Sequence, residues 1–310
     1  MAKLSSINTF DINGERLKPL LVPRVAGTPE NVRVRQFIVD HFQTLGWHVE
    51  LDSFQDDTPF GKKSFTNIIA THNPDAQRRL IVSAHFDSKY YEEFEFIGAT
   101  DSAVPCGIMM DMAETLNPML DRDDNSLTLQ MVFFDGEEAF VSWTDTDSIY
   151  GARHLAEKWE TTYVNPPMHT IKSQNELSKV DVLVLLDLLG TPNPTIPNYY
   201  RETSSVYYRL VELEARLTKQ GLLETHSSKD GKELRSIFDP HSIMTFQGRR
   251  MGDDHVPFLH RGVNILHIIP QPFPLVWHNE NDSASCIDPA VVQNLATLFR
   301  GFVLEYMELS

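Results

Sequence analysis

Four short apolar runs are the feature that most constrains the fold of this 310-residue chain. The runs cover residues 80–84, 127–134, 180–186 and 263–269. Apolar runs of this length are typical of strands that are buried on both faces, as in a parallel or mostly parallel sheet. The sequence therefore predicts a central sheet that is covered on both sides.

Helical patterns lie before, between and after these runs. Residues 28–46 carry an apolar stripe at helical spacing, with Thr28 as a cap, Pro29 in the first turn and Gly46 at the end. Further helices are expected over residues 108–116, from about 148, over 204–219 and over 288–306. Because strands and helices alternate, the expected class is α/β, with a mostly parallel, twisted central sheet flanked by helices on both faces.

The chain shows no linker rich in proline, glycine or serine, so we expect residues 1–310 to form a single domain. Two irregular, polar segments, residues 165–178 and 226–252, interrupt the strand and helix pattern. Loops of this length inside a compact domain are usually functional or mobile.

Composition excludes several classes of function. The 27 basic and 43 acidic residues give a net charge of −16, which argues against binding to a phosphate backbone. A cationic peptide partner and a mere role in solubility both remain compatible with that charge. No apolar run approaches the roughly 20 residues that cross a bilayer, and the first residues lack the apolar core of a signal peptide.

The two cysteines, Cys106 and Cys286, form no CxxC pair, which excludes a thiolate zinc site. A disulfide between them and two free thiols are both compatible with the sequence.

Acidic residues and histidines follow the apolar runs at the point where each strand is expected to end. His85 and Asp87 follow the first run, Glu137 and Glu138 the second, and Asp187 the third. In open α/β sheets, ligands bind outside the carboxyl ends of the strands. Each residue alone could be a cap or a turn residue, but together they predict one crevice lined by carboxylates and imidazole.

The adjacent pair Glu137 and Glu138 is the sharpest signal in this set. Two neighbouring carboxylates beside an apolar run repel each other and lose hydration, so a cation is the simplest partner. Histidine and carboxylate without thiolate suit zinc in a catalytic site, with three protein ligands and one open position. Mg²⁺ and Ca²⁺ fit less well because they prefer shells made only of oxygen.

Several stretches resemble a known family. The segment PRVAGTP (residues 23–29), the strand end at His85 and the glutamate pair resemble the co-catalytic zinc aminopeptidases, and the match to animal glutaminyl cyclases is much closer. The matching stretches are HFDSKYY (85–91), GATDSAVPCG (98–107), FFDGEEAF (133–140), DSIYGARHLA (147–156), VLLDLLGTPNP (184–194), DDHVPFLHRGV (253–263) and PFPLVWH (272–278). They cover nearly the whole chain.

The resemblance implies an enzyme with one zinc per chain that converts N-terminal glutamine, and more slowly glutamate, of peptides and proteins to pyroglutamate. By position, the zinc ligands would be Asp101, Glu138 and His278. Glu137 would be the general acid and base, moving a proton from the α-amine to the departing ammonia.

The resemblance also implies a set of supporting residues. Asp187 and Asp253 would form a carboxylate network that shares a proton and keeps Asp187 from binding a second metal. The substrate pocket would be shaped by Trp143, His267, Phe273 and Trp277. A monomer in the secretory pathway is expected, with a mitochondrial or other intracellular location left open.

Two positions depart from the family pattern. Cyclases with a disulfide in this region carry cysteine where this chain has Ala84, so Cys106 is expected to have no partner. Where members of the family often carry glutamine, this chain has Gly252, so one substrate contact is expected to be missing or made by backbone.

Two other functions remain as alternatives. A two-zinc aminopeptidase would use five ligands that this chain retains: His85, Asp101, Glu138, Asp187 and His278. The cyclase is favoured because the stretches that begin at Asp253 and Pro272 look like those of the cyclases. A non-enzymatic binding module on the same fold is the second alternative, since fold alone does not carry function.

Overall fold

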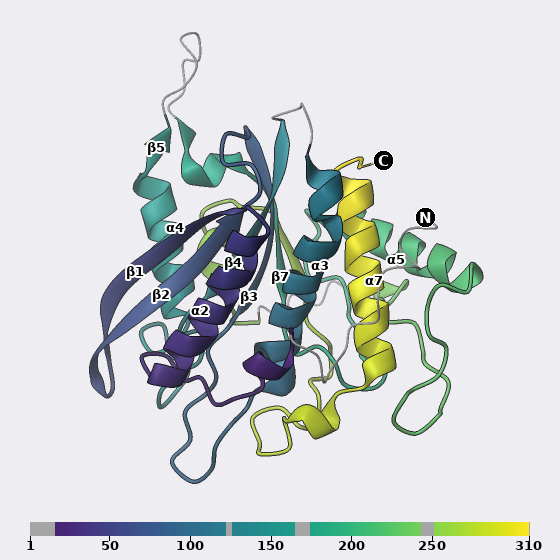
Figure 1. The fold of residues 1–310 in the computed structure, drawn as a ribbon, viewed down its shortest axis with the longest axis horizontal. Helices are drawn as coiled ribbons and strands as arrows, with labels where there is room; N and C mark the ends of the chain where they lie inside the picture. The colour runs from purple at the N-terminus through teal and green to yellow at the C-terminus, as the bar shows by residue number, and fades with distance from the viewer. Residues whose placement is uncertain (1–15, 122–125, 165–173, 243–250, 310) are drawn as a thin grey trace.

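A twisted six-stranded sheet forms the centre of the computed structural model, which describes residues 16–121, 126–164, 174–242 and 251–309 (Figure 1). The strands are β1 (His48–Thr58), β2 (Gly61–Thr71), β3 (Arg78–His85), β4 (Leu127–Phe134), β7 (Val180–Leu186) and β8 (Ile265–Ile268). Their order in the sheet is β1-β2-β4-β3-β7-β8. Neighbours among β4, β3, β7 and β8 are parallel, and β2 runs antiparallel to both β1 and β4.

The four predicted apolar runs are the four parallel strands, which confirms the mostly parallel sheet. The hairpin of β1 and β2 was not predicted. The reason is that β1 is a partly exposed edge strand whose sequence contains several acidic residues and no apolar run. An edge strand buries only part of its surface, so continuous hydrophobicity cannot reveal it.

Helices cover both faces of the sheet, as predicted. Their bounds are α2 (Pro29–Thr44), α3 (Val104–Leu120), α4 (Tyr150–Thr161), α5 (Ser204–Lys219), α6 (Val256–Leu259) and α7 (Pro289–Tyr306). The larger core contains buried side chains of α2, α3, α5 and α7, whereas α4 and α6 contribute to the smaller core on the other face. In Figure 1, α2, α3 and α7 lie in front of the sheet.

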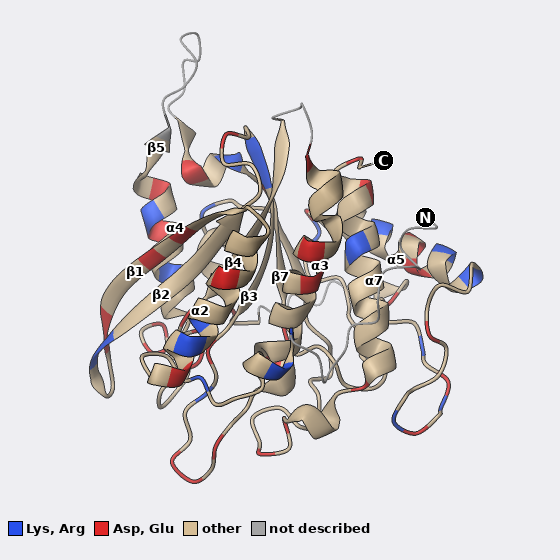
Figure 2. Cartoon of the chain, viewed as in Figure 1, with Lys and Arg blue, Asp and Glu red and all other residues tan. Residues whose placement is uncertain are grey.

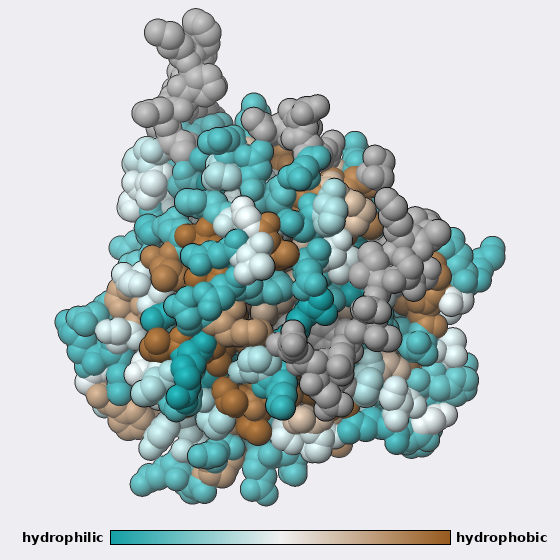
Figure 3. All heavy atoms as spheres, viewed as in Figure 1, coloured by the Kyte–Doolittle hydropathy of each residue, from teal (hydrophilic) through white to brown (hydrophobic). Residues whose placement is uncertain are grey.

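Alternation along the strands explains why two cores form. In β3, Leu80 and Val82 point into the larger core and Ile81 into the smaller one. Charged residues are concentrated on loops and outer helix faces, while the central strands are mostly free of them (Figure 2). The face that carries α2 is mostly hydrophilic, with hydrophobic residues interspersed (Figure 3).

Local signals at the helix ends are confirmed. The Thr28 hydroxyl accepts a hydrogen bond from the Asn31 backbone amide at 3.3 Å, and Asp288 accepts one from the Ala290 amide at 3.0 Å. Such caps satisfy amides that have no partner inside the helix. None of the helices in the described part of the chain is long and apolar enough to cross a membrane.

The two segments predicted as irregular are partly described. Residues 165–173 and 243–250 lie outside the described residues. The remainder of the first segment contains β6 (Gln174–Asn175), which pairs with β5 (Tyr163–Val164), and a 3₁₀ turn over Glu176–Lys179. In the second, an isolated bridge joins His226 to Glu233.

Candidate active site

Three ligand-type side chains meet at the carboxyl edge of the sheet. Asp101 comes from a kinked turn, η2 (Ala99–Ala103), in which its own backbone is not helical and which leads into α3. Glu138 follows β4, and His278 follows β8. His278 Nε2 lies 3.5 Å from Asp101 Oδ2 and 3.4 Å from Glu138 Oε1. We call these three residues the cation cluster.

The cation cluster fits a metal ion. One ligand atom from each of its residues lies within 4.8 Å of the other two. Asp101 Oδ2 and Glu138 Oε1 are buried and make no hydrogen bond. Buried carboxylate oxygens without a donor are costly unless a cation neutralises them. The donor set of one imidazole and two carboxylates suits catalytic zinc.

The electrostatics of the cation cluster agree with this fit. Burial lowers the pKa of His278, but the neighbouring carboxylates of Asp101 and Glu138 outweigh it and raise that pKa to about 9. Burial raises the pKa of Asp101, yet the two histidines beside it, His278 and His85, hold it well below its usual range. The carboxylate oxygens of Asp101 and Glu138 thus carry negative charge toward the point where His278 supplies a positive one.

Two further residues support the glutamate pair: Asp87, predicted only as one of the acidic residues at the strand ends, and Lys89, to which the sequence assigned no role. Asp87 accepts hydrogen bonds from the backbone amides of Glu137 at 3.1 Å and Glu138 at 3.2 Å. Lys89 Nζ lies 3.3 Å from Glu138 Oε2 and donates to the Ala139 carbonyl at 3.0 Å. Both residues lie in the HFDSKYY stretch, so their position beside His85 was the available signal.

A cavity of about 410 Å³ opens onto the cation cluster; we call it the catalytic cavity. Glu137 and Asp187 line it, together with three of the four predicted substrate residues: Trp143, Phe273 and Trp277. Burial raises the pKa of Glu137 well above its ordinary value; His85 opposes this shift, and the Glu138 charge adds to it. Burial therefore favours the protonated form of this carboxyl group.

His85 joins the cation cluster to Asp187. His85 Nε2 lies 2.9 Å from Asp101 Oδ1 and 3.5 Å from Asp187 Oδ1. Asp187 Oδ1 also accepts hydrogen bonds from the Ser102 hydroxyl and from the Leu188 amide. Burial raises the pKa of Asp187 to about 6, although the hydrogen bond with His85 lowers it. His85, Asp101 and Asp187 also lie close enough to hold an ion.

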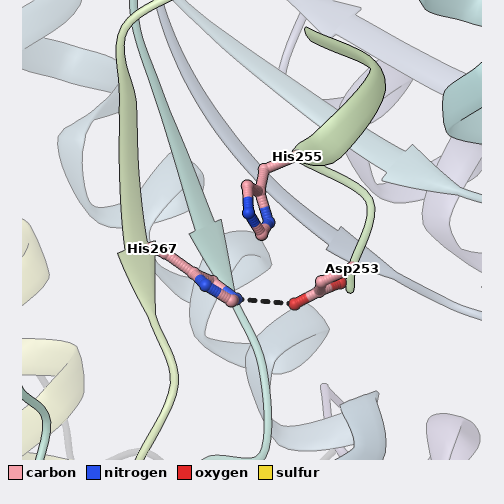
Figure 4. Close-up of side chains that lie close together, drawn as sticks. All are labelled: Asp253, His255 and His267. Atoms are coloured by element: carbon pink, nitrogen blue, oxygen red, sulfur yellow. Dashed lines mark hydrogen bonds and ion pairs between the residues drawn. The ribbon is translucent and has the colours of Figure 1, made fainter. Parts of the chain in front are cut away.

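A third group, the buried histidine cluster, consists of Asp253, His255 and His267 (Figure 4). His267 Nε2 lies 2.6 Å from Asp253 Oδ2, and His255 Nε2 lies 2.5 Å from the Tyr200 hydroxyl. The two imidazole rings pack with centroids 4.3 Å apart. Burial lowers the pKa of each histidine to about 3, so both rings are neutral.

Two predicted residues are not part of the lining of the catalytic cavity. His267 and Asp253 are buried and are not among the side chains that line it. Asp253 accepts a hydrogen bond from the Asp254 amide at 2.7 Å, and its charge helps raise the pKa of Asp187. Asp253 thus acts on Asp187 through its charge, and the shared proton stays a prediction.

Asp254 received no role from the sequence, although it is fully buried. Neither of its carboxylate oxygens makes a hydrogen bond, and burial raises its pKa well above the ordinary value, with a further contribution from Asp253.

The two departures from the family pattern have structural consequences. Both cysteines are free thiols, and the buried Cys106 donates to the His85 carbonyl at 3.1 Å, which confirms that it has no disulfide partner. Gly252 lines the catalytic cavity, and a Cβ at this position would lie 2.9 Å from Trp143 Nε1. The indole of Trp143 therefore occupies the space that a larger residue would need.

Comparison with known proteins agrees with this site. The sequence profile of Peptidase family M28 matches residues 67–303. The glutaminyl-peptide cyclotransferase of Drosophila melanogaster is 47% identical over 298 residues, which are 94% of this chain and 80% of that protein. The Bos taurus glutaminyl-peptide cyclotransferase is 43% identical over 304 residues, covering 94% of this chain and 81% of that protein.

A solved structure agrees as well. The crystal structure of Macrostomum lignano glutaminyl cyclase has a TM-score of 0.84 and 39% sequence identity, and covers 99% of this chain and 92% of that chain. These matches confirm the resemblance read from the motifs. The chain belongs to peptidase family M28 and, within it, to the glutaminyl-peptide cyclotransferases.

Proposed function

We propose that this chain is a zinc-dependent glutaminyl-peptide cyclotransferase that converts N-terminal glutamine, and more slowly glutamate, to pyroglutamate. The observation that carries the proposal is the position of Glu137, whose pKa is raised, beside a three-ligand cluster in which two buried carboxylate oxygens make no hydrogen bond. The relatives that share 43–47% identity with this chain carry the same activity in their names.

The cation cluster would hold one zinc ion through Asp101, Glu138 and His278. When bound, zinc would polarise the γ-carbonyl of the substrate glutamine. The other chemical tasks fall to side chains of this protein, above all to Glu137.

Glu137 lines the same cavity as the ligands, where both nitrogens of the reaction would be bound. It accepts a proton from the α-amine as the amine nitrogen forms a bond to the γ-carbon. It then returns that proton to the amide nitrogen, which leaves as ammonia when its bond to the γ-carbon breaks. A carboxyl group whose pKa is raised toward neutrality can perform both transfers in sequence.

Aromatic side chains supply orientation. Trp143, Phe273 and Trp277 line the cavity and would hold the glutamine side chain curled, with its amine close to its own amide. Both reacting groups belong to one residue, so restricting its conformations can contribute much of the rate enhancement. Outside the cavity lining, His267 Nε2 lies 2.6 Å from Asp253 Oδ2 and keeps the Asp253 carboxylate in place.

The two-zinc aminopeptidase is the second candidate, because His85, Asp101 and Asp187 also form a possible ion site. Two observations favour one zinc. Asp187 Oδ1 already accepts hydrogen bonds from Ser102 and Leu188, and His85 lies 2.9 Å from Asp101. These contacts engage His85 Nε2 and Asp187 Oδ1, so a second ion that used these two atoms would have to displace them.

Release of ammonia from a glutamine-initiated peptide tests the proposal. Purified protein should release ammonia and contain one zinc per chain, and imidazole should inhibit by occupying the open metal position. A leucine-initiated peptide is the control and should remain intact. Two tightly bound zinc ions per chain, together with release of leucine, would show that the protein is the aminopeptidase and not the cyclase.

Other aspects of the biology belong to the same proposal. We expect one catalytic domain over residues 1–310, a monomer, and substrates that are peptides and proteins with N-terminal glutamine. By resemblance to the family, we expect the secretory pathway as its location.

A further inference from the structure

Exposed apolar side chains gather around the mouth of the catalytic cavity. Among the described residues, ten large hydrophobic side chains are exposed, and six of them line the catalytic cavity or one of two cavities beside it. These six are Phe60, Tyr90, Val141, Trp143, Leu275 and Trp277. Contiguous exposed apolar surface marks binding sites on otherwise hydrophilic proteins.

One neighbouring cavity is strongly aromatic. It measures about 450 Å³ and lies between the turn that joins β1 to β2 and the loop after β3. Its aromatic lining residues are Phe60, Tyr90, Tyr91, Phe94, Phe96 and Phe140. The Phe60 ring lies 5.4 Å from that of Tyr90 and 5.9 Å from that of Phe140. We call this cavity the aromatic groove.

The aromatic groove lies next to the catalytic cavity, and the two are separated by a wall that contains Lys89. Lys89 lines both, and the adjacent residues Phe140 and Val141 line one each. Lys89 is held in this wall by its contacts with Glu138 and with the Ala139 carbonyl. A peptide whose first residue reaches the cation cluster can therefore cross this wall and continue along the groove.

We propose that the aromatic groove binds the residues that follow the N-terminal glutamine, and that it favours substrates with an aromatic side chain among them. The inference rests on the proposed function, because a bound N-terminal residue must have its chain leave the catalytic cavity. Aromatic pairs prefer edge-to-face or offset contacts, and Phe60 and Tyr90, half exposed at 51% and 40%, are free to make them.

A third cavity offers the competing exit. It shares Phe273 with the catalytic cavity and is lined mainly by prolines, threonines and Leu275, whose side chain is fully exposed. Its lining is apolar but contains only one aromatic ring, so it would select for size rather than for aromatic character. Leu275 therefore provides a matched control.

The test compares peptides rather than a single rate. The substrates are glutaminyl-alanine amide, an all-alanine pentapeptide with N-terminal glutamine, and pentapeptides with phenylalanine at position 2, 3 or 4. We expect wild-type kcat/KM to be about tenfold higher for at least one phenylalanine peptide than for the all-alanine peptide. Phe60→Ser and Tyr90→Ser should each reduce this ratio to about twofold, whereas Leu275→Ser should preserve it.

Other results would contradict either the role of the groove or the proposed function. Equal kcat/KM for all pentapeptides, or loss of the preference only in Leu275→Ser, would overturn the groove. A change in oligomeric mass in Phe60→Ser, with an unchanged ratio, would assign the groove to contacts between copies and also overturn it. Failure of the wild-type protein to cyclise the dipeptide would instead overturn the proposed function.

A different observation concerns Arg24, whose side chain is fully buried although its hydrogen bonds to the described residues all go to backbone carbonyls. Its guanidinium donates to the carbonyls of Phe86 at 2.7 Å, Gly98 at 3.0 Å and Asp101 at 3.4 Å, and also to Ile97. These carbonyls lie at the two ends of the loop between β3 and α3, which carries Lys89.

Gly98 shows how tightly this loop closes. Its φ of 59° is left-handed, and a Cβ there would lie only 2.2 Å from the Asp101 carbonyl oxygen. We infer that Arg24 is a positioning residue that holds the backbone of Asp101, so that the Asp101 carboxylate lies beside Glu138 and His278 in the cation cluster. Residues that orient metal ligands from behind typically change metal affinity by about 10- to 100-fold.

The chain contains a matched control. Arg300 is equally buried, but its guanidinium pairs with Asp111 between α3 and α7. We expect Arg24→Lys to weaken zinc binding at least about tenfold, measured by competition with a chelator, and Arg300→Lys to leave it within about twofold. Gly98→Ala, which disturbs the same turn, should weaken zinc binding as well.

If Arg24→Lys lowers the melting temperature as much as Arg300→Lys yet binds zinc like the wild type, Arg24 is merely structural. If Arg24→Lys does not fold, Gly98→Ala decides: unchanged zinc affinity in that variant would overturn the inference.

Discussion

The cation cluster and the buried histidine cluster contain the same kinds of side chain in different surroundings. His278 of the cation cluster has 24% of its side chain exposed and faces the catalytic cavity. His267 of the buried histidine cluster is completely enclosed and faces Asp253. The pKa of His278 is raised to about 9, whereas that of His267 is lowered to about 3.

The number of carboxylates per histidine explains these opposite shifts. His278 faces two acidic side chains, each with a buried oxygen that makes no hydrogen bond. His267 faces one, Asp253, whose own pKa is raised by burial. Burial alone therefore produces neutral histidines, which pack against each other and hold a neighbouring carboxylate in place. A cation site requires excess negative charge and an opening to solvent.

The largest expected difference between the clusters is in metal content. His278→Ala removes one of three ligands, so we expect it to lose zinc and all measurable cyclisation. His267→Ala should keep its zinc. It should still lose about 1–3 kcal/mol of stability, because Asp253 loses a buried hydrogen-bond partner. Metal analysis after dialysis, with chemical denaturation of both variants, provides the measurement.

Zinc loss in His267→Ala, with zinc retained in His278→Ala, would reverse the roles assigned to the two clusters. Full occupancy in both variants would move the metal site to His85, Asp101 and Asp187.

A smaller effect on cyclisation is expected when the proton-transfer group is removed and all three metal ligands are kept. Glu137→Gln keeps the shape of the side chain but cannot move a proton, so cyclisation should fall about 10²- to 10⁴-fold with zinc retained. The measurement combines steady-state ammonia release with metal analysis. A variant that keeps more than about a tenth of the wild-type rate would exclude Glu137 as the acid and base.

The sequence predicted most of the framework, because continuous apolar runs report directly on strands buried from both sides. It could not predict β1, whose partly exposed edge position leaves no such run. Motifs likewise placed the cation cluster, since its three residues lie in stretches that resemble the glutaminyl cyclases.

Contacts made behind the ligands were beyond sequence reasoning. Asp87 binds backbone amides and Arg24 binds backbone carbonyls. Because backbone groups are the same in every residue, neither contact can be recognised from the types of side chain in the sequence. His267 was expected in the substrate pocket but lies outside the cavity lining, because a residue in the middle of a buried strand points into the core. Periodicity indicates that such a residue is buried but not which neighbour it meets.

The smallest expected effect is on the pH dependence of stability, and it concerns His255. Its folded pKa of about 3 lies below the ordinary value of about 6.5, because burial disfavours the charged ring. Between these values the unfolded chain binds a proton that the folded chain does not. The free energy of unfolding therefore falls by about 1.4 kcal/mol per pH unit for this histidine as pH drops below about 6.5.

Other groups act in the opposite direction. Asp135, with a pKa raised to about 7 by burial, binds its proton more readily in the folded state and adds stability as pH falls. Comparing wild type with His255→Gln cancels such contributions, since both proteins retain Asp135. We expect the slope of unfolding free energy against pH, between pH 6.5 and 5 in metal-free protein, to be smaller in the variant by about 1.4 kcal/mol per unit. Equal slopes would mean that His255 is charged in the folded state, and the contrast between a charged cation cluster and a neutral buried histidine cluster would no longer hold.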